Sequence, residues 1–209
     1  MTLTLIGFGE AGQAIAQGLR TEPNGPEISC FDIKSLDPHQ ASSITQAASK
    51  HGVSDHTSLA EALQGASYVI STVTAGSAPE VAQAVADLRP TLEAYFDMNS
   101  VSPGTKRHEA KVLEHAGIAY VDTAVMAPIH PRLHRTPVLL AGPKAEALER
   151  VLGQWGMDTA ATRPLELLLH PLVPCLDHHP THTESTLAPP RLFCQAFVLV
   201  AAQPQTTAM

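Results

Sequence analysis

The segment Gly7-Phe-Gly-Glu-Ala-Gly12 lies close to the start of the 209-residue chain and decides its fold class. A short apolar run over residues 3–6 precedes it and has the composition of a β-strand. After it, Ala11, Ile15 and Leu19 recur every four residues, which predicts one face of a helix. A glycine-rich turn between a strand and a helix is typical of open, parallel α/β sheets.

Each glycine of this turn has a separate physical reason. Gly7 permits the tight turn out of the strand, Gly9 leaves the backbone open to a pyrophosphate, and Gly12 lets the helix pack closely on the sheet. The N–H groups at the start of the helix, and the positive end of its dipole, would then hold the phosphates. The candidate cofactor-binding residues of this turn are Gly7, Phe8, Gly9, Glu10, Ala11 and Gly12.

Asp32 lies twenty residues after Gly12, at the end of a second apolar run over residues 28–31. A carboxylate at this place accepts hydrogen bonds from the ribose hydroxyls of adenosine. It repels a 2′-phosphate, which favours NAD over NADP, whereas the nearby Lys34 could attract that phosphate. The sequence therefore predicts a site for NAD, with NADP as the alternative, and the competing interpretation is a glycine-rich turn without a ligand.

The alternation of strands and helices continues to about residue 160. The expected further strands cover residues 66–73, 95–98, 118–125 and 137–141, and the expected further helices cover residues 41–51, 58–63, 79–88, 103–115 and 144–152. Strands that alternate with helices form βαβ units with right-handed crossovers and a mostly parallel sheet. The sequence therefore predicts an α/β fold, a Rossmann-type doubly wound sheet, over residues 1–160.

The composition changes near Arg163. Residues 164–209 contain seven prolines but no glycine and no lysine. Prolines at this density break helices and remove hydrogen-bond donors from strands. Residues 161–209 are therefore expected to form an irregular tail rich in proline and histidine, not a complete second domain. The tail holds Cys175 and several histidines, but their spacing matches no zinc site, so no metal is expected.

The overall composition narrows the classes of partner and location. The net charge of −7 disfavours nucleic acid and anionic membranes as partners. No stretch approaches the roughly 18 apolar residues that span a bilayer, and the first residues do not read as a signal peptide. Cys30, Cys175 and Cys194 show no disulfide or metal spacing. A cytoplasmic location is expected.

Small polar residues follow the predicted strand over residues 95–98. Ligands of open α/β sheets bind beyond the carboxyl ends of the strands, so Asn99 and Ser100 are candidates to contact a nicotinamide or a substrate carboxylate. Ser102 and Pro103 instead have the pattern of a helix N-cap and first helical residue.

The loop after residue 125 contains two histidines and two arginines. His130 and His134 could act as acid–base groups, but exposed loop histidines are the favoured interpretation. Arg132 and Arg135 could hold an anionic substrate.

In their order and spacing, the segments 7–12, 97–103 and 120–125 resemble the β-hydroxyacid dehydrogenases. That family includes 3-hydroxyisobutyrate dehydrogenase and the NAD-binding domain of 6-phosphogluconate dehydrogenase. The segments 99–107 and 125–131 are similar to a bacterial branch of NAD(P)-dependent oxidoreductases with a helical C-terminal domain. The resemblance covers residues 1–160 and implies hydride transfer between NAD(P) and a small hydroxy acid. A homodimer is a candidate assembly, although the tail stands where the family has the helical domain that builds its dimer.

The resemblance also implies roles for particular residues. Val73 and Thr74 would lie on the loop that covers the cofactor, and Ser100 near the nicotinamide. Many members grip the substrate carboxylate with a Ser-Gly-Gly segment, where this chain has Met126-Ala-Pro128.

The larger departure concerns the catalytic lysine, which the family places about where residues 165–175 fall. This chain has no lysine after Lys144, so no catalytic residue is assigned. The change near Arg163 suggests a truncated or frame-shifted gene product with low activity. Three hypotheses stay open: an impaired dehydrogenase, a dinucleotide-binding module without turnover, and a scaffold whose tail recruits a partner.

Overall fold

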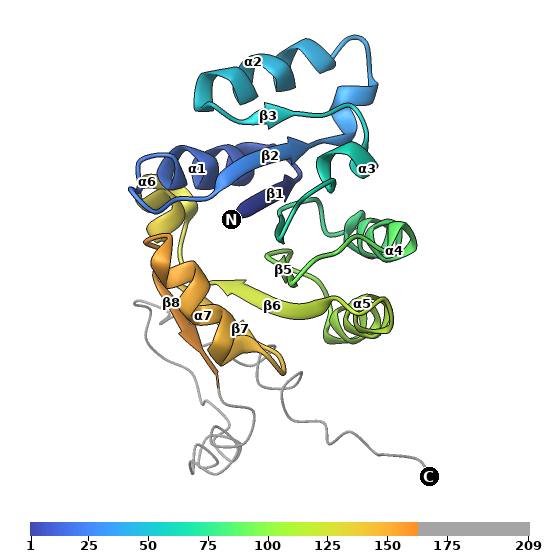
Figure 1. Cartoon of the computed structure of the whole chain (residues 1–209), viewed down its shortest axis with the longest axis vertical. Helices are drawn as coiled ribbons and strands as arrows, with labels where there is room; N and C mark the ends of the chain where they lie inside the picture. Colours follow the sequence, from blue (N-terminus) through green and yellow to red (C-terminus); the bar gives the residue numbers. More distant parts are fainter. Residues whose placement is uncertain (163–209) are drawn as a thin grey trace, which may run out of the picture.

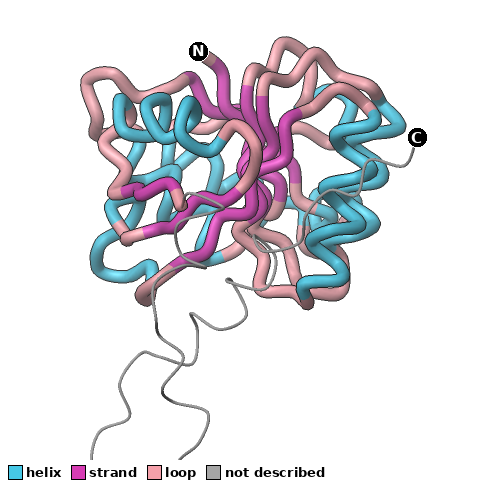
Figure 2. The backbone as a smooth tube through the Cα atoms, turned by 90° about the horizontal axis from the view of Figure 1, so that it is seen from below, coloured by secondary structure: helices cyan, strands magenta, loops and turns pink. Residues whose placement is uncertain are grey.

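The computed structural model describes residues 1–162, which form an eight-stranded sheet between two layers of helices (Figures 1 and 2). The strands are β1 (Thr2–Ile6), β2 (Glu27–Phe31), β3 (Ser54–Asp55), β4 (Tyr68–Ser71), β5 (Ala94–Asp97), β6 (Ala119–Val125), β7 (Val138–Ala141) and β8 (Thr159–Ala161). The helices are α1 (Glu10–Leu19), α2 (Ala41–His51), α3 (Leu59–Ala62), α4 (Ala78–Leu88), α5 (Pro103–His115), α6 (Ile129–Arg132) and α7 (Ala145–Gln154), with 3₁₀ turns η1 (Ile33–Leu36) and η2 (Leu133–Arg135).

The strands lie in the order β3-β2-β1-β4-β5-β6-β7-β8, and every neighbouring pair is parallel except β6 and β7. From β1 the chain first builds the sheet outward through β2 and β3, and it then returns to β4 on the other side of β1. The switch between the two halves therefore falls between β1 and β4, where open α/β sheets bind their ligands. The predicted Rossmann-type, mostly parallel sheet is confirmed.

Alternate residues of the central strands β4, β5 and β6 enter two apolar cores, one on each face of the sheet. Leu5, Ile70 and Phe96 pack on the face that α1, α2 and α7 cover, whereas Val69 and Tyr95 pack on the face of α3, α4 and α5. Period-two alternation of this kind is what a sheet covered on both faces requires. Two helix layers therefore fix the sheet and hold the carboxyl ends of its strands in register.

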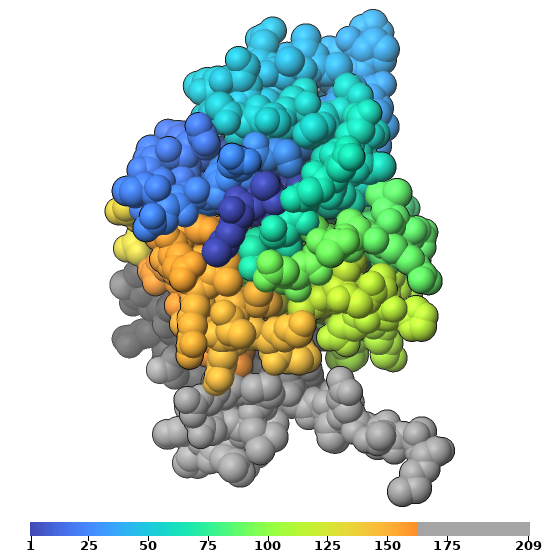
Figure 3. All heavy atoms as spheres, viewed as in Figure 1, coloured from blue at the N-terminus to red at the C-terminus, as the bar shows by residue number. Residues whose placement is uncertain are grey.

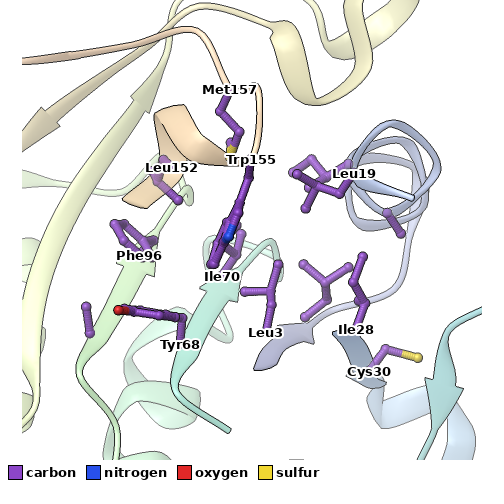
Figure 4. Close-up of a cluster of buried hydrophobic side chains, with 14 of the residues drawn as sticks. Leu3, Leu19, Ile28, Cys30, Tyr68, Ile70, Phe96, Leu152, Trp155 and Met157 are labelled. Carbon is purple, nitrogen blue, oxygen red and sulfur yellow. The ribbon is translucent and has the colours of Figure 1, made fainter. Parts of the chain in front are cut away.

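The last described helix closes the first core. Trp155, 1% exposed, directs its ring edge at the Tyr68 ring, with 5.5 Å between the ring centroids (Figure 4). Leu152 and Met157 lie beside it and Leu19 of α1 lies across the same cluster. The orange residues of α7 accordingly lie beside the blue N-terminal residues in the space-filling view (Figure 3). The N-terminal half of the fold therefore needs the segment up to Met157 to complete its core.

Several predicted elements agree closely with the structure, and others do not. The helix predicted over residues 103–115 matches α5, and Ser102 caps it by accepting a hydrogen bond from the Thr105 N–H at 3.2 Å. The strand predicted over residues 66–73 is shorter, since β4 spans Tyr68–Ser71. The strands β3 and β8 were not predicted, because they are short and carry small or polar side chains.

The predicted irregular tail over residues 161–209 lies outside the described residues, apart from Ala161 and Thr162. It stays a prediction. Within residues 1–162, no helix has the length and apolar character needed to cross a membrane.

The favoured interpretation of both loop histidines as exposed is wrong for His134. Its side chain is 4% exposed and packs against Gly18 of α1, and its Nε2 lies 2.9 Å from Glu22 Oε1. The same Glu22 oxygen accepts from Arg135 at 2.6 Å, and these bonds lower the pKa of Glu22. His134 therefore ties the loop after β6 to the end of α1, whereas His130 is exposed as expected.

Gly18→Ala should destabilise the fold by about 1–3 kcal/mol, because an added Cβ would overlap the His134 ring. Urea unfolding of the full chain would measure this loss. Gly153→Ala on α7 is the matched control, since a Cβ there meets no atom within 4 Å. Equal stability of the Gly18→Ala variant and the wild type would contradict the packing described here.

Candidate dinucleotide-binding site

The glycine turn follows β1 at the switch point of the sheet. Gly7 has φ +87°, a backbone conformation that residues other than glycine rarely adopt. A Cβ added there would lie 2.8 Å from the Thr72 carbonyl oxygen. At Gly12 an added Cβ would overlap the Gly7 carbonyl oxygen and approach Thr72 Oγ1 at 3.2 Å. Both glycines are therefore needed for the chain to fold this tightly between β1, α1 and the end of β4.

Gly9 is different, because the fold does not require a glycine there. Its φ of −76° suits any residue, and an added Cβ meets no atom within 4 Å. Gly9 is exposed, next to the exposed Glu10 at the start of α1. A glycine at this position leaves room for a group from outside the chain to approach the backbone.

The N-terminus of α1 is open as well. Gly9 is the N-cap residue and makes no side-chain cap hydrogen bond, so no side chain of residues 1–162 satisfies the first N–H groups of the helix in that way. The Phe8 side chain is fully buried in the first core, so only its backbone belongs to the turn. Free N–H groups at the positive end of a ten-residue helix are suited to an anion.

Asp32 lies at the end of β2 and holds the turn in place. Its Oδ2 accepts from the Phe8 N–H at 2.7 Å, and its Oδ1 accepts from the Lys34 N–H at 2.9 Å as the cap of η1. The residue is 8% exposed, and two bonds leave about half of the acceptor positions of a carboxylate unused. The Phe8 N–H therefore serves Asp32 and is not available to a phosphate.

The segment after β4 lies beside the glycine turn. Thr72 Oγ1 donates to the Gly7 carbonyl oxygen at 2.8 Å, and Val73 packs against the second core. Thr74 is exposed, and its hydroxyl lies 2.9 Å from the Ser77 hydroxyl at the start of α4. The structure thus brings Val73 and Thr74 to the same edge of the sheet as Gly7.

The segment after β5 lies next along this edge. Asn99 is 6% exposed, and its side-chain N–H groups donate to Ser71 Oγ at 3.0 Å and to Asp97 Oδ1 at 2.6 Å. Ser100 is exposed. The Asn99 amide nitrogen thus joins the ends of β4 and β5, whereas its Oδ1 has no hydrogen-bond partner within residues 1–162, so both Asn99 and Ser100 stay ligand candidates.

Five buried polar residues lie under this segment, and we refer to Asp97, Lys106, Glu109, Tyr120 and Asp122 as the Lys106 cluster. Lys106 Nζ lies 2.7 Å from Asp97 Oδ2 and 3.0 Å from Asp122 Oδ1. The Tyr120 hydroxyl donates to Asp97 Oδ2 at 2.7 Å and lies 3.3 Å from Glu109 Oε2. Burial of a cation is tolerated here because two carboxylates surround it.

The Lys106 cluster was not predicted from the sequence. A signal was present, because Lys106, Glu109 and the buried Leu113 are spaced by three and four residues on one face of α5. That spacing puts two charged side chains on the face that packs on the sheet, where they need partners.

A family model described as the NAD binding domain of 6-phosphogluconate dehydrogenase matches residues 2–158. The chain belongs to this family. The resemblance predicted from the sequence is therefore confirmed. No curated protein sequence matches the chain.

Solved structures that are similar to the chain agree with its assignment to this family. A conserved hypothetical protein from Sinorhizobium meliloti 1021 is 32% identical, with a TM-score of 0.71 over 78% of this chain and 54% of that one. The conserved protein MTH1747, described as structurally similar to 3-hydroxyacid dehydrogenases, is 26% identical, with a TM-score of 0.65 over 78% and 58%. The Mycobacterium tuberculosis 3-hydroxyisobutyrate dehydrogenase is 20% identical, with a TM-score of 0.61 over 77% and 53%, and shows the shared fold. The chain spans a little over half the length of these structures.

The protonation of the Lys106 cluster follows from its geometry in this family member. Burial, then the hydrogen bond and charge of Asp97, raises the pKa of Glu109 to about 8. Burial opposes ionisation of Asp97, but the Lys106 ammonium and the surrounding hydrogen bonds hold its pKa below the usual range. Burial raises the pKa of Asp122. At neutral pH the cluster therefore holds Asp97 ionised beside a protonated Glu109.

Glu109→Gln should remove part of the pH dependence of folding. Glu109 has a higher pKa in the folded state than its usual 4.5, so the folded state keeps a proton that the unfolded state loses. Its contribution is complete below about pH 4.5 and disappears as the pH rises to about 8. The unfolding free energy of the variant minus that of the wild type should therefore increase by more than about 1 kcal/mol from pH 5.5 to pH 8.5. Urea unfolding at both pH values checks this, and a constant difference would contradict the assignment.

Proposed function

We propose that residues 1–162 bind a nicotinamide dinucleotide along the carboxyl edge of the sheet, with its pyrophosphate against Gly9 and the start of α1. The main support for the proposal is that residue 9 is a glycine although the fold does not need one there. Its φ suits any residue, and an added Cβ would meet no atom within 4 Å. The uncapped helix N-terminus beside it supports the same reading. The phosphates would take the N–H groups from Gly9 to Gly12, since Phe8 donates to Asp32.

The adenosine end of the cofactor would lie beside Asp32. Its unused acceptor positions suit the ribose hydroxyls, and its charge opposes a 2′-phosphate, which supports NAD as the preferred cofactor. The exposed Lys34 side chain keeps NADP as the alternative. The nicotinamide end would lie beside Val73, Thr74 and Ser100, at the ends of β4 and β5.

Asp32→Asn is expected to shift the preference from NADH toward NADPH by roughly tenfold, because it removes the charge and keeps the shape. The amide oxygen can replace one of the two acceptors of Asp32, so some loss of affinity for both cofactors is expected too. Calorimetric titration of the wild type and the variant with each cofactor measures the ratio of the two affinities. An unchanged ratio would remove Asp32 from the selection of the cofactor.

The reaction that we propose is hydride transfer between NAD(P) and the hydroxyl-bearing carbon of a small hydroxy acid. When bound, the nicotinamide supplies or accepts the hydride, and the chain binds and orients it. No residue of the described part of the chain is assigned as the general acid or base. Lys106 does not serve, because its ammonium is buried between Asp97 and Asp122. The alternative is a dinucleotide-binding module without turnover. A cytoplasmic location and a homodimer remain parts of the proposal.

The test of turnover is a stopped-flow measurement of NADH absorbance, with the full chain, NAD⁺ and a panel of small hydroxy acids. Loss of a general acid costs on the order of 10²–10⁴ in rate, so we expect turnover far below the ordinary value of about 10 per second. A rate near that ordinary value would contradict the proposed impairment. Binding without detectable turnover would favour the alternative function.

A further inference from the structure

Both oxygens of the buried Asp97 carboxylate, at the end of β5, accept hydrogen bonds from within the protein. It is 0% exposed, and its Oδ1 accepts from the backbone N–H and the side-chain amide of Asn99, at 2.9 and 2.6 Å. Its Oδ2 accepts from Lys106 and from the Tyr120 hydroxyl, each at 2.7 Å. A carboxylate has about four acceptor positions, so these four bonds, together with the hydrogen bond between Asp97 and Glu109, leave none for a ligand. The orientation of this carboxylate is therefore fixed by its hydrogen bonds with Lys106 of α5 and Tyr120 of β6.

Lys106 is equally saturated. Its three N–H donors have three acceptors: Asp97 Oδ2 at 2.7 Å, Asp122 Oδ1 at 3.0 Å and the Asp97 carbonyl oxygen at 3.1 Å. One side chain of α5 thus holds the last residue of β5 by both its side chain and its backbone, and joins it to β6. Nothing of this ammonium remains for a ligand, so its influence on a ligand must be indirect.

Asp97 in turn fixes the orientation of the Asn99 side-chain amide. Because the carboxylate can only accept, it forces the Asn99 amide to present its nitrogen, and the same nitrogen donates to Ser71 Oγ at the end of β4. The next residue after Ser71 is Thr72, whose hydroxyl donates to the Gly7 carbonyl oxygen. The ends of β4 and β5 are therefore connected by hydrogen bonds that start at Lys106, and the peptide bond between Ser71 and Thr72 continues this connection to the end of β1.

We propose that Lys106 is a positioning residue for the nicotinamide half of the cofactor. Through Asp97 and Asn99 it fixes the ends of β4 and β5, against which that half would lie, and so sets the affinity for it without touching it. This inference rests on the proposed function. It assigns the adenosine half to Gly9 and Asp32, which lie outside the hydrogen bonds of Asp97.

The test compares two ligands of the full chain by calorimetry: NADH, and ADP-ribose, which lacks the nicotinamide. Tyr120→Phe removes one donor to Asp97, and Asn99→Ala removes the connection to Ser71. A charge-balanced double variant, Lys106→Met with Asp122→Asn, removes the cation and one of its anions. Lys111→Met, an exposed lysine of the same helix, is the matched control.

We expect NADH affinity to fall about tenfold in the Asn99→Ala and double variants, less in Tyr120→Phe, with ADP-ribose affinity unchanged and the control like the wild type. A merely structural cluster would weaken both ligands together, and that outcome overturns the inference. An unchanged NADH affinity in both Tyr120→Phe and Asn99→Ala also overturns the inference. The same holds if the wild type binds NADH and ADP-ribose with equal affinity. Wild-type binding of ADP-ribose separates these results from failure of the proposed function, in which neither ligand binds and both proposals fall.

Discussion

Gly9→Val is expected to weaken NADH binding at least about 100-fold and to leave the chain folded. The valine side chain would occupy the space against the backbone into which the pyrophosphate is proposed to fit. The fold should tolerate it, because Gly9 has an extended backbone with φ −76° and ψ −158°, and a Cβ there meets nothing within 4 Å. The cost in unfolding free energy should stay near 1 kcal/mol, which is the usual penalty of a poor N-cap residue. Calorimetry gives the affinity and urea unfolding gives the stability.

Gly12→Val is the informative comparison for Gly9→Val. A Cβ at Gly12 would overlap the Gly7 carbonyl oxygen, so this variant should lose stability as well as affinity. If Gly9→Val bound NADH like the wild type, the space at Gly9 would have no role in binding. If it unfolded the chain, the open surroundings of Gly9 described here would be wrong.

Lys106→Met is expected to cost about 3–5 kcal/mol of unfolding free energy, because it leaves Asp97 and Asp122 buried without their cation. Urea unfolding at neutral pH measures the loss. Adding Asp122→Asn to this variant should recover part of it, since one of the two unpaired charges is then removed. Lys111→Met should stay within about 0.5 kcal/mol of the wild type, as surface substitutions usually do. A loss below about 1 kcal/mol for Lys106→Met would show that the two carboxylates do not depend on Lys106.

The sequence predicted what local spacing controls. The turn from Gly7 to Gly12 and the cap at Ser102 depend on residues that are close together along the chain, and Asp32 was found by its spacing of twenty residues from Gly12. Their positions in the structure agree with the roles expected of glycines in a tight turn and of a serine before Pro103. The family assignment depends on the same local segments, and the match over residues 2–158 confirms it.

The sequence did not predict what tertiary packing controls. Whether His134 is buried depends on Gly18 of a distant helix, which leaves room for the imidazole ring. The partners of Lys106 come from β5 and β6, and only the sheet brings them together. The antiparallel direction of β7 depends on the path of the loop after β6, which the pattern of apolar residues does not encode. Asn99 was named as a ligand candidate; its amide nitrogen donates to Ser71 and Asp97, whereas its buried Oδ1 has no hydrogen-bond partner within residues 1–162, so the candidacy stays a prediction.

Calorimetric titration of the purified full chain with NADH and, separately, with NADPH tests directly whether the glycine turn holds a nicotinamide dinucleotide. We predict that NADH binds at one site per chain and that NADPH binds more weakly, because Asp32 opposes the 2′-phosphate. Absence of binding by either cofactor would contradict this prediction, and the glycine turn would then describe the ancestry of the chain and not its activity.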